Sequence, residues 1–252
     1  MTGVSKQPVL RVVDGAYHAG VDALAIEAPI RITSEAGHGV ELLATPTDLV
    51  ELSIGHAICE GWLPTLNVLP TVERSDVDGT VVLHLSGASW ATPLPHRSIM
   101  PSCGGCGLTL DPPPSGTFLP PAVRVEPGDV EGWVHGLQTE QPLFNATGGT
   151  HAAALVSDAG LIVREDIGRH SAVDKVIGAW ALSSSRASVR CLMVSGRCGW
   201  DVMAKAVRAG VRQVIALGAV SSQAAELARH EGMLVVGFAA GHRPQFLGPW
   251  SS

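Results

Sequence analysis

The sequence predicts an α/β protein in which a mixed sheet carries helices on both faces and a smaller α+β domain precedes it. From about residue 127, helical and strand-like segments follow one another in the order α-β-β-α-β-α-β-α-β. Hydrophobic residues make up 46% of the 252 residues and charged residues 16%, which excludes a disordered chain. A segment rich in proline and glycine, 92–121, separates the two halves. We therefore expect an N-terminal domain at 1–91, a loop at 92–126 and the main domain at 127–252.

The N-terminal half shows weaker patterns. Residues 11–33 alternate between apolar and polar and are interrupted by glycine and proline, which predicts short strands. Residues 43–63 contain apolar positions at helical spacing, and Thr45 or Thr47 is a suitable cap for that helix. The run Val-Val-Leu-His-Leu at 81–85 predicts a further strand.

The C-terminal half has clear periodicity and clear stop signals. The expected elements are a helix at 127–140, strands at 151–157 and 161–166 around the turn Asp158-Ala159-Gly160, a helix at 168–182, a strand at 189–196, a helix at 199–210, a strand at 212–220, a helix at 221–232 and a strand at 233–240. Gly210 and Gly232 are typical of helix ends. In such sheets ligands gather at the carboxyl ends of strands and at helix N-termini.

Charge and cysteine content narrow the function classes. Lys and Arg number 17 against 23 Asp and Glu, a net charge of -6, which argues against a nucleic-acid coat protein. No apolar run reaches the roughly 18 residues of a membrane span, and the first residues lack a signal-peptide pattern. The five cysteines are an odd number, so we expect reduced thiols in a cytoplasmic protein.

The first candidate for chemistry is the pair Cys103 and Cys106 in Pro-Ser-Cys-Gly-Gly-Cys-Gly. Glycines leave the two thiols accessible, and the second cysteine can resolve or relay a sulfur atom bound to the first. Half of a zinc site is an alternative, but the remaining cysteines do not form a second pair at this spacing, so we expect no metal. We also expect the loop that holds the pair to be poorly ordered without a partner.

The second candidate is an anion-binding site built from glycine pairs and arginines at strand ends. Two arginines at helix N-termini favour a phosphate, and an aromatic side chain beside an arginine suits a purine. The candidate binding residues are Thr147, Gly148, Gly149, His151, Asp166, Gly168, Arg169, His170, Ser195, Gly196, Arg197, Phe238, Ala239, Ala240, Gly241, His242 and Arg243. Tight turns, surface ion pairs and a core phenylalanine are the alternative interpretations of these segments.

Several motifs in this order resemble the FdhD/NarQ family of formate dehydrogenase accessory sulfurtransferases. They are TPTDLVELSIGHAICEGW, SCGGCG, FNATGGTHAAAL, EDIGRHSAVDKVIGAW, SGRCGWDVMAKAVRAG and the Gly-Phe at 237–238. The resemblance implies a cytidine-deaminase-like main domain. It also implies that Cys103 carries a persulfide, received from a cysteine desulfurase and passed to the molybdenum cofactor of formate dehydrogenase. The loop at 238–243 would then contact the guanine dinucleotide of that bis(molybdopterin guanine dinucleotide) cofactor, and a GDP-like ligand is expected. Because the loop that holds the cysteines needs anchoring, we also expect a homodimer whose subunits pack through the C-terminal domain.

Two other functions remain open at this stage. A non-catalytic chaperone that binds and inserts the molybdenum cofactor would need the binding residues but not the thiols. A zinc deaminase needs His-x-Glu on one helix and Pro-Cys-x-x-Cys on the next. The sequence has no His followed two residues later by Glu, and Cys198 alone cannot build that zinc site.

Overall fold

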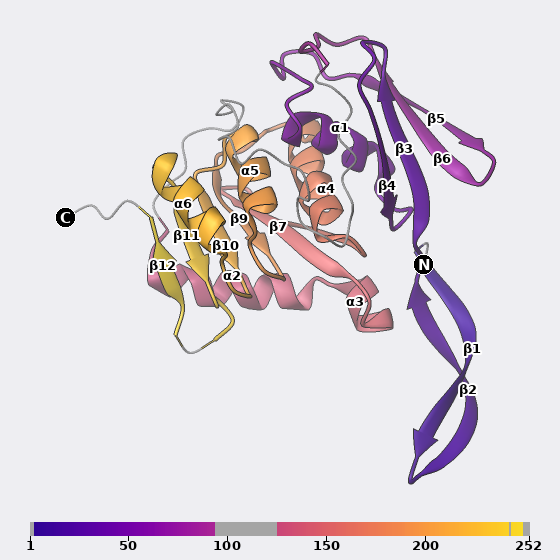
Figure 1. Ribbon diagram of the computed structural model, residues 1–252. Coiled ribbons are helices and arrows are strands. Elements are labelled where there is room, and N and C mark those ends of the chain that lie inside the picture. Colours follow the sequence, from indigo (N-terminus) through magenta and orange to yellow (C-terminus); the bar gives the residue numbers. More distant parts are fainter. Residues whose placement is uncertain (1–2, 94–124, 242, 249–252) are drawn as a thin grey trace.

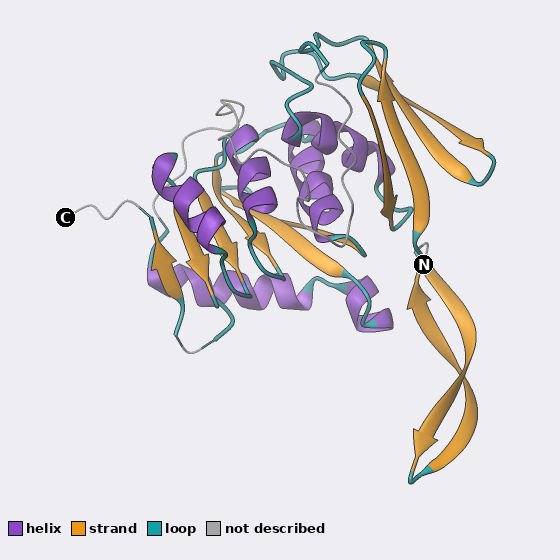
Figure 2. Ribbon diagram, viewed as in Figure 1, coloured by secondary structure: helices purple, strands orange, loops and turns teal. Residues whose placement is uncertain are grey.

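A computed structural model describes residues 3–93, 125–241 and 243–248. Within these ranges the chain forms a six-stranded sheet, a four-stranded sheet and a separate two-stranded hairpin (Figures 1 and 2). Most of the predicted loop at 92–126, including Cys103 and Cys106, lies outside the described residues, as does His242. The expectation that this loop orders only with a partner therefore stays a prediction.

The six-stranded sheet is the larger unit. Its order is β12 (Gln245–Leu247), β11 (Leu234–Gly237), β10 (Gln213–Ala216), β9 (Val189–Val194), β7 (His151–Ser157) and β8 (Gly160–Asp166). Strands β9, β10 and β11 are parallel to one another, while β7 runs antiparallel to both β9 and β8. The carboxyl ends of β8, β9, β10 and β11 and the start of β7 consequently meet at one edge.

Helices cover both faces of this sheet, as predicted. Alternate residues of β7 point to opposite sides, so Ala154 packs with α2 (Pro127–Thr139) and Leu155 packs with α4 (Arg169–Leu182). Helices α5 (Trp200–Arg208) and α6 (Ser222–His230) complete the second face. None of the described helices has both the length and the apolar character that a membrane span requires. The mixed α/β architecture is confirmed, and the more specific likeness to a cytidine deaminase stays a prediction.

The four-stranded sheet lies in the N-terminal half. Its order is β4 (Gly39–Ala44), β3 (Ala28–Ser34), β6 (Thr80–Ser86) and β5 (Thr71–Val77). Side chains such as Ile30 and Leu83 pack into the same hydrophobic cluster as Val176 and Leu192 of the main sheet region. The core is thus continuous across residue 91, and the division into domains at that point remains a prediction.

Helix α1 (Leu49–Cys59) joins the two sheets by packing against α4 (Figure 1). The two backbones touch at glycines. A Cβ atom on Gly55 would lie 2.6 Å from the carbonyl carbon of Asp174, and one on Gly178 would lie 2.7 Å from the carbonyl carbon of Glu51. Only residues without a side chain allow so close an approach.

The N-terminus differs most from the expected short strands. Strands β1 (Val4–Val13) and β2 (Ala16–Ala25) form one long hairpin with a two-residue turn. Pro8 is accommodated because each strand has only one neighbour, and an edge strand tolerates a residue without an amide proton. Gly20 remains inside β2, where the Arg11 guanidinium lies over it.

The prediction that Thr45 or Thr47 caps α1 is also wrong. The residue before the helix is Asp48, in a left-handed conformation, and no side chain caps the first turn. Thr45 and Thr47 bind the buried Lys175 ammonium instead, through a backbone carbonyl and a hydroxyl, each at 3.1 Å. A buried cation needs several acceptors, and this requirement outweighs local capping. The pattern also missed α3 (Pro142–Thr147), β5 and β12, which are short or largely exposed.

We predict that Gly178→Ala destabilises the fold by about 3 kcal/mol or more, because the new methyl group collides with the backbone of α1. The free energy of unfolding in urea measures this. Gly132→Ala is the matched control, since a Cβ atom there meets nothing within 4 Å; it should stabilise α2 by about 0.5–1 kcal/mol. Equal unfolding free energies for Gly178→Ala and the wild type would contradict the close packing of the two helices.

Candidate functional site

Most of the predicted binding residues gather at one edge of the six-stranded sheet. Five segments end or begin there: the start of β7, the end of β8, and the loops that follow β9, β10 and β11. They carry Thr147, Gly148, Gly149, His151, Asp166, Gly168, Arg169, His170, Ser195, Gly196, Arg197, Phe238, Ala239, Ala240, Gly241 and Arg243. The topology thus brings together residues that are up to 96 positions apart, as counted from Thr147 to Arg243.

Backbone hydrogen bonds join the three loops of this edge. The Gly218 amide donates to the Gly196 carbonyl at 3.0 Å, and the Phe238 amide donates to the Gly218 carbonyl at 2.8 Å. A Cβ atom on Gly218 would lie only 3.1 Å from the backbone of Gly196. Ser195 ties the loops to β7, because its hydroxyl accepts from the Ala152 amide at 2.9 Å. The edge is therefore a continuous backbone platform.

Positive charge concentrates on this platform. The pKa of His151 is lowered by burial and by the positive charges of Arg169, His170 and Arg197, so the imidazole is neutral at pH 7. The Arg169 Nε atom is buried and has no hydrogen-bond partner among the described residues. Its guanidinium lies 3.7 Å from the Asp201 carboxylate. A buried, unpaired N–H donor in a positive environment suits an anion such as a phosphate.

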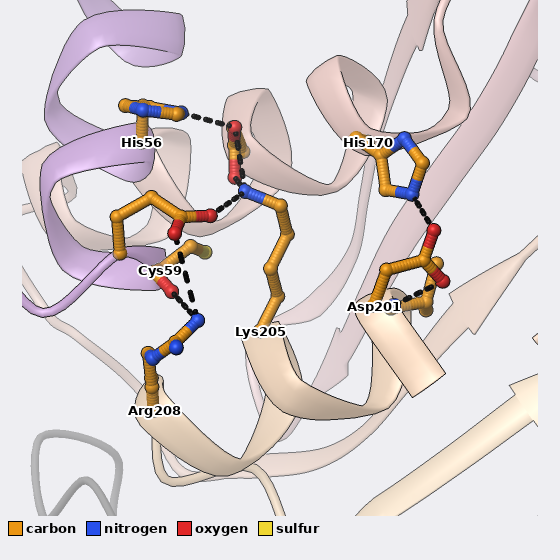
Figure 3. Close-up of polar contacts among 9 residues, drawn as sticks. His56, Cys59, His170, Asp201, Lys205 and Arg208 are labelled. Carbon is orange, nitrogen blue, oxygen red and sulfur yellow. Dashed lines mark hydrogen bonds and ion pairs between the residues drawn. The ribbon is translucent and has the colours of Figure 1, made fainter. Parts of the chain in front are cut away.

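Asp201 holds the start of α4 in place. Its carboxylate pairs with the His170 Nε2 atom (Figure 3). The carboxylate also accepts a hydrogen bond from the backbone amide of Val202, the next residue, at 2.8 Å. Burial alone would raise the pKa of Asp201, but the hydrogen bond and charge of His170 lower it well below its ordinary value. The pair links α4 to α5 next to Arg169, whose guanidinium lies near the same carboxylate.

Phe238 lies at the end of β11 with an unusual backbone. Its φ of 53° is left-handed, which is uncommon for an aromatic residue, and its side chain is 44% exposed. The hydrogen bonds of its amide to Gly218 and of its carbonyl to the Gly241 amide fix this conformation. The ring is therefore presented at the surface of the platform and is not a core residue.

Two of the predicted binding residues, Asp166 and Thr147, already make their polar contacts within the protein. Asp166 is fully buried and pairs with Lys175 at 2.7 Å, and it also accepts the amides of Thr45 and Gly168. The Thr147 hydroxyl donates to the Leu143 carbonyl. These two residues position the backbone of the site, and neither has the free polar atoms that a ligand contact needs.

A small pocket lies beside the platform and shares His170 with it. Its volume is about 40 Å³, and its polar lining includes His56, Asp174 and Lys205. Lys205 donates to Asp174 and to Glu60, each at 2.8 Å, and His56 bonds Asp174 at 2.9 Å (Figure 3). Burial would raise the pKa of Asp174, but the Lys205 charge and the His56 hydrogen bond lower it to about 2. Because these groups satisfy one another, the cluster anchors α1 to α4 and α5.

The described cysteines are poor nucleophiles. Cys59, Cys191 and Cys198 are all free and all buried. Burial raises the pKa of each thiol, to about 12 for Cys198, so none of the three forms a thiolate at neutral pH. In the described part of the chain, no three His, Cys, Asp or Glu side chains are arranged to hold a metal ion.

Comparison with known proteins identifies the family. The family model described as the FdhD/NarQ family matches residues 25–247. The chain belongs to the FdhD/NarQ family. The match includes every described segment of the platform and both cysteines of the Cys103–Cys106 pair.

The sequences of individual FdhD relatives align with most of this chain. A protein of Variovorax paradoxus is 34% identical over 87% of this chain and 82% of its own length, and one of Streptomyces avermitilis is 34% identical over 94% and 90%. Both are named "Sulfur carrier protein FdhD". A crystal structure from Desulfotalea psychrophila, provisionally described as a formate dehydrogenase accessory protein, has the same fold: the TM-score is 0.71 over 98% of this chain and 97% of that one, at 19% identity.

Sequence reasoning missed Asp201, Gly218 and the cluster around Lys205. Asp201 lies in the first turn of α5, where acidic residues are common, and nothing in the linear pattern pairs it with His170. Gly218 lies inside a segment that was predicted as strand through to Val220. Its close approach to Gly196 depends on the spacing between two neighbouring strands, which periodicity does not report.

We predict that Arg169→Gln raises the pKa of His151, because the substitution removes one of the positive charges that lower it. Titration of the His151 ring signals by NMR measures this. Arg190→Gln is the control, since Arg190 lies at the other end of β9 and pairs with Asp158. A His151 pKa that is the same in Arg169→Gln and in the wild type would show that the two side chains do not share one electrostatic environment.

Proposed function

We propose that this chain is a sulfur carrier that receives sulfur as a persulfide on Cys103 and delivers it to the molybdenum cofactor of formate dehydrogenase. The observation that carries the proposal is that the three thiols other than Cys103 and Cys106 are buried and have raised pKa values. Three of the five cysteines are buried with raised pKa values, which leaves Cys103 and Cys106 as the candidates for sulfur chemistry. The relatives from Variovorax paradoxus and Streptomyces avermitilis are named sulfur carrier proteins, which supports the same role.

The loading step needs a thiolate at Cys103 and a persulfide donor, for which a cysteine desulfurase is the expected source. The Cys103 Sγ atom attacks the terminal sulfur of the donor's persulfide. A new S–S bond forms on Cys103, the S–S bond of the donor breaks, and the donor cysteine leaves as a thiolate. No net oxidation occurs, because the sulfur atom changes carrier at the same oxidation level.

The unloading step uses Cys106 as the reductant. The Cys106 thiolate attacks Cys103 Sγ, a disulfide forms between the two cysteines, and hydrosulfide leaves for the acceptor. Two thiol groups of a cellular reductant must then reduce this disulfide, and they are themselves oxidised to a disulfide, before the next cycle. This role agrees with the Cys-x-x-Cys spacing, which allows the two sulfur atoms to meet.

The platform is the proposed binding place for the cofactor's guanine dinucleotide. The described residues fit such a ligand: the Arg169 Nε atom lacks a partner among them, Arg197 is exposed beside it, and Phe238 presents a ring for stacking. The bis(molybdopterin guanine dinucleotide) is the client of the reaction, and formate dehydrogenase is its destination. The name of the Desulfotalea psychrophila protein supports that destination.

We predict that incubation with a cysteine desulfurase and cysteine adds a sulfur mass to the peptide that contains Cys103. Cys103→Ala should abolish both the added mass and the delivery of sulfur, while Cys191→Ala should keep both because Cys191 is a buried core residue. Peptide mass spectrometry locates the sulfur. Added mass on Cys191 or Cys198 alone would refute the assignment. A Cys103→Ala protein that still activates formate dehydrogenase would favour a chaperone that only binds and inserts the cofactor.

We predict that Arg169→Ala and Arg197→Ala each weaken GDP binding about 10- to 100-fold, since a charge-assisted hydrogen bond to phosphate contributes about 1.5–3 kcal/mol. Isothermal titration calorimetry measures the affinity. Arg190→Ala, at the other end of β9, should bind GDP like the wild type. Wild-type affinity in both platform variants would remove the basis for the nucleotide site.

A further inference from the structure

His151 lies within the positively charged part of the platform. It is the first residue of β7, and the neighbouring strand β9 leads into the loop that holds Gly196. A Cβ atom on Gly196 would lie 3.5 Å from both the Nδ1 and the Cε1 atoms of His151, and 3.5 Å from the Cδ atom of Arg169. The imidazole ring and the Arg169 side chain therefore lie against the same glycine.

The His151 ring has unused polar atoms at this position. The residue is half-buried, and its ring makes no hydrogen bond or ion pair with another described residue. The Arg169 Nε atom is buried and also lacks a partner within the described ranges. Buried polar groups normally have partners, so two neighbouring groups without one point to a ligand that bonds both.

Charged groups on several elements surround the ring. Helix α4 contributes Arg169 and His170, and the loop after β9 contributes Arg197. The nearest carboxylate of α5 is Asp201, which is already bound by His170 and lies 3.7 Å from the Arg169 guanidinium. Asp201 therefore offsets the charge of α4 and makes no contact with His151.

Strand β8 also places a carboxylate on the same side of the sheet. Asp166 is the cross-strand partner of His151, and cross-strand partners share a face. The Asp166 carboxylate, however, pairs with the buried Lys175 ammonium at 2.7 Å. Its negative charge is thus offset inside the core, and the environment of the imidazole ring stays positive.

We propose that His151 is neutral in the empty platform and takes up one proton from the solvent when the platform binds a phosphate group. The imidazolium ring then becomes a third cationic donor to that phosphate, beside Arg169 and Arg197. This inference rests on the proposed nucleotide site and adds to it a proton-linked residue that regulates the affinity.

The empty and the occupied platform differ in what they require of this ring. Burial and the positive charges of Arg169, His170 and Arg197 lower the pKa of His151, so a further cation in the empty site would be repelled. A bound phosphate reverses this environment, because an anion within about 4–6 Å favours the protonated imidazole. A histidine can meet both requirements since its charge changes near neutral pH, whereas a third arginine would stay charged in the empty site.

The sign of the pH dependence follows from this coupling. The protonated ring binds an anion more tightly, so the contribution of His151 is greatest below the pKa of the free protein. It is lost as the pH rises through the higher pKa of the complex. Each increase of about 1 in the pKa corresponds to about tenfold in affinity between these two limits.

NMR titration of the His151 ring signals, in the full-length wild type with and without saturating GDP, tests the proposal directly. GDP should raise the pKa of His151 by about 1 or more. His135 is the internal control, because it lies exposed on α2, which packs against the other face of the sheet. Its pKa should be the same in both samples.

Calorimetric GDP affinities at pH 5 and pH 8 add a second measurement. The terminal phosphate of GDP titrates in this range too, and His151→Gln keeps that contribution while it removes the titrating ring. The ratio of the affinity at pH 5 to that at pH 8 should be about tenfold larger in the wild type than in His151→Gln. His135→Gln should give the wild-type ratio.

The outcomes separate this inference from the proposed function. GDP binding to the platform with an unchanged His151 pKa, or with the same affinity ratio in the wild type and His151→Gln, would overturn the proton coupling and leave the nucleotide site intact. A wild type that does not bind GDP at either pH would contradict the nucleotide site itself, and the coupling with it.

Discussion

The close contact between α1 and α4 is the constraint on which the candidate site depends. Gly55 and Gly178 allow the two helix backbones to touch, and a side chain at either position would overlap the facing backbone. This contact fixes the position of α4 along its own axis and its rotation about that axis. Arg169 and His170 form the first turn of that helix, so the same contact sets where the positive charge of the platform lies.

Two buried lysines, Lys175 in α4 and Lys205 in α5, reinforce this arrangement. Lys175 binds Asp166 and the segment before α1, while Lys205 binds Asp174 and Glu60. Removing one partner of a buried ion pair leaves an uncompensated charge, which typically costs about 3–5 kcal/mol. Both clusters bond residues that lie far apart in sequence, and both join the N-terminal half to the main sheet. Elements from both halves of the chain thus hold the platform in place, although the polar groups of the platform lie at the edge of the six-stranded sheet.

The sequence allowed the main sheet and its platform to be predicted because their signals are local. Apolar periodicity located α4 and β9, and the arginines that follow the strand ends indicated the edge at which the predicted binding residues gather. Interactions across the chain could not be predicted in this way. The Asp201–His170 pair spans two helices, and the threonines expected to cap α1 bind Lys175 instead. Gly20 resembled a strand break, yet it lies within a continuous hairpin.

The central claim is that the edge formed by β8, β9, β10 and β11 binds the guanine nucleotide portion of the client cofactor. Amide chemical-shift mapping of the isotope-labelled, full-length protein during titration with GDP tests this claim most directly. The account predicts that the largest shifts gather at 168–170, 195–197, 218 and 238–241. Shifts that gather instead around the pocket beside His56, or along the hairpin, or no shifts at all, would contradict it.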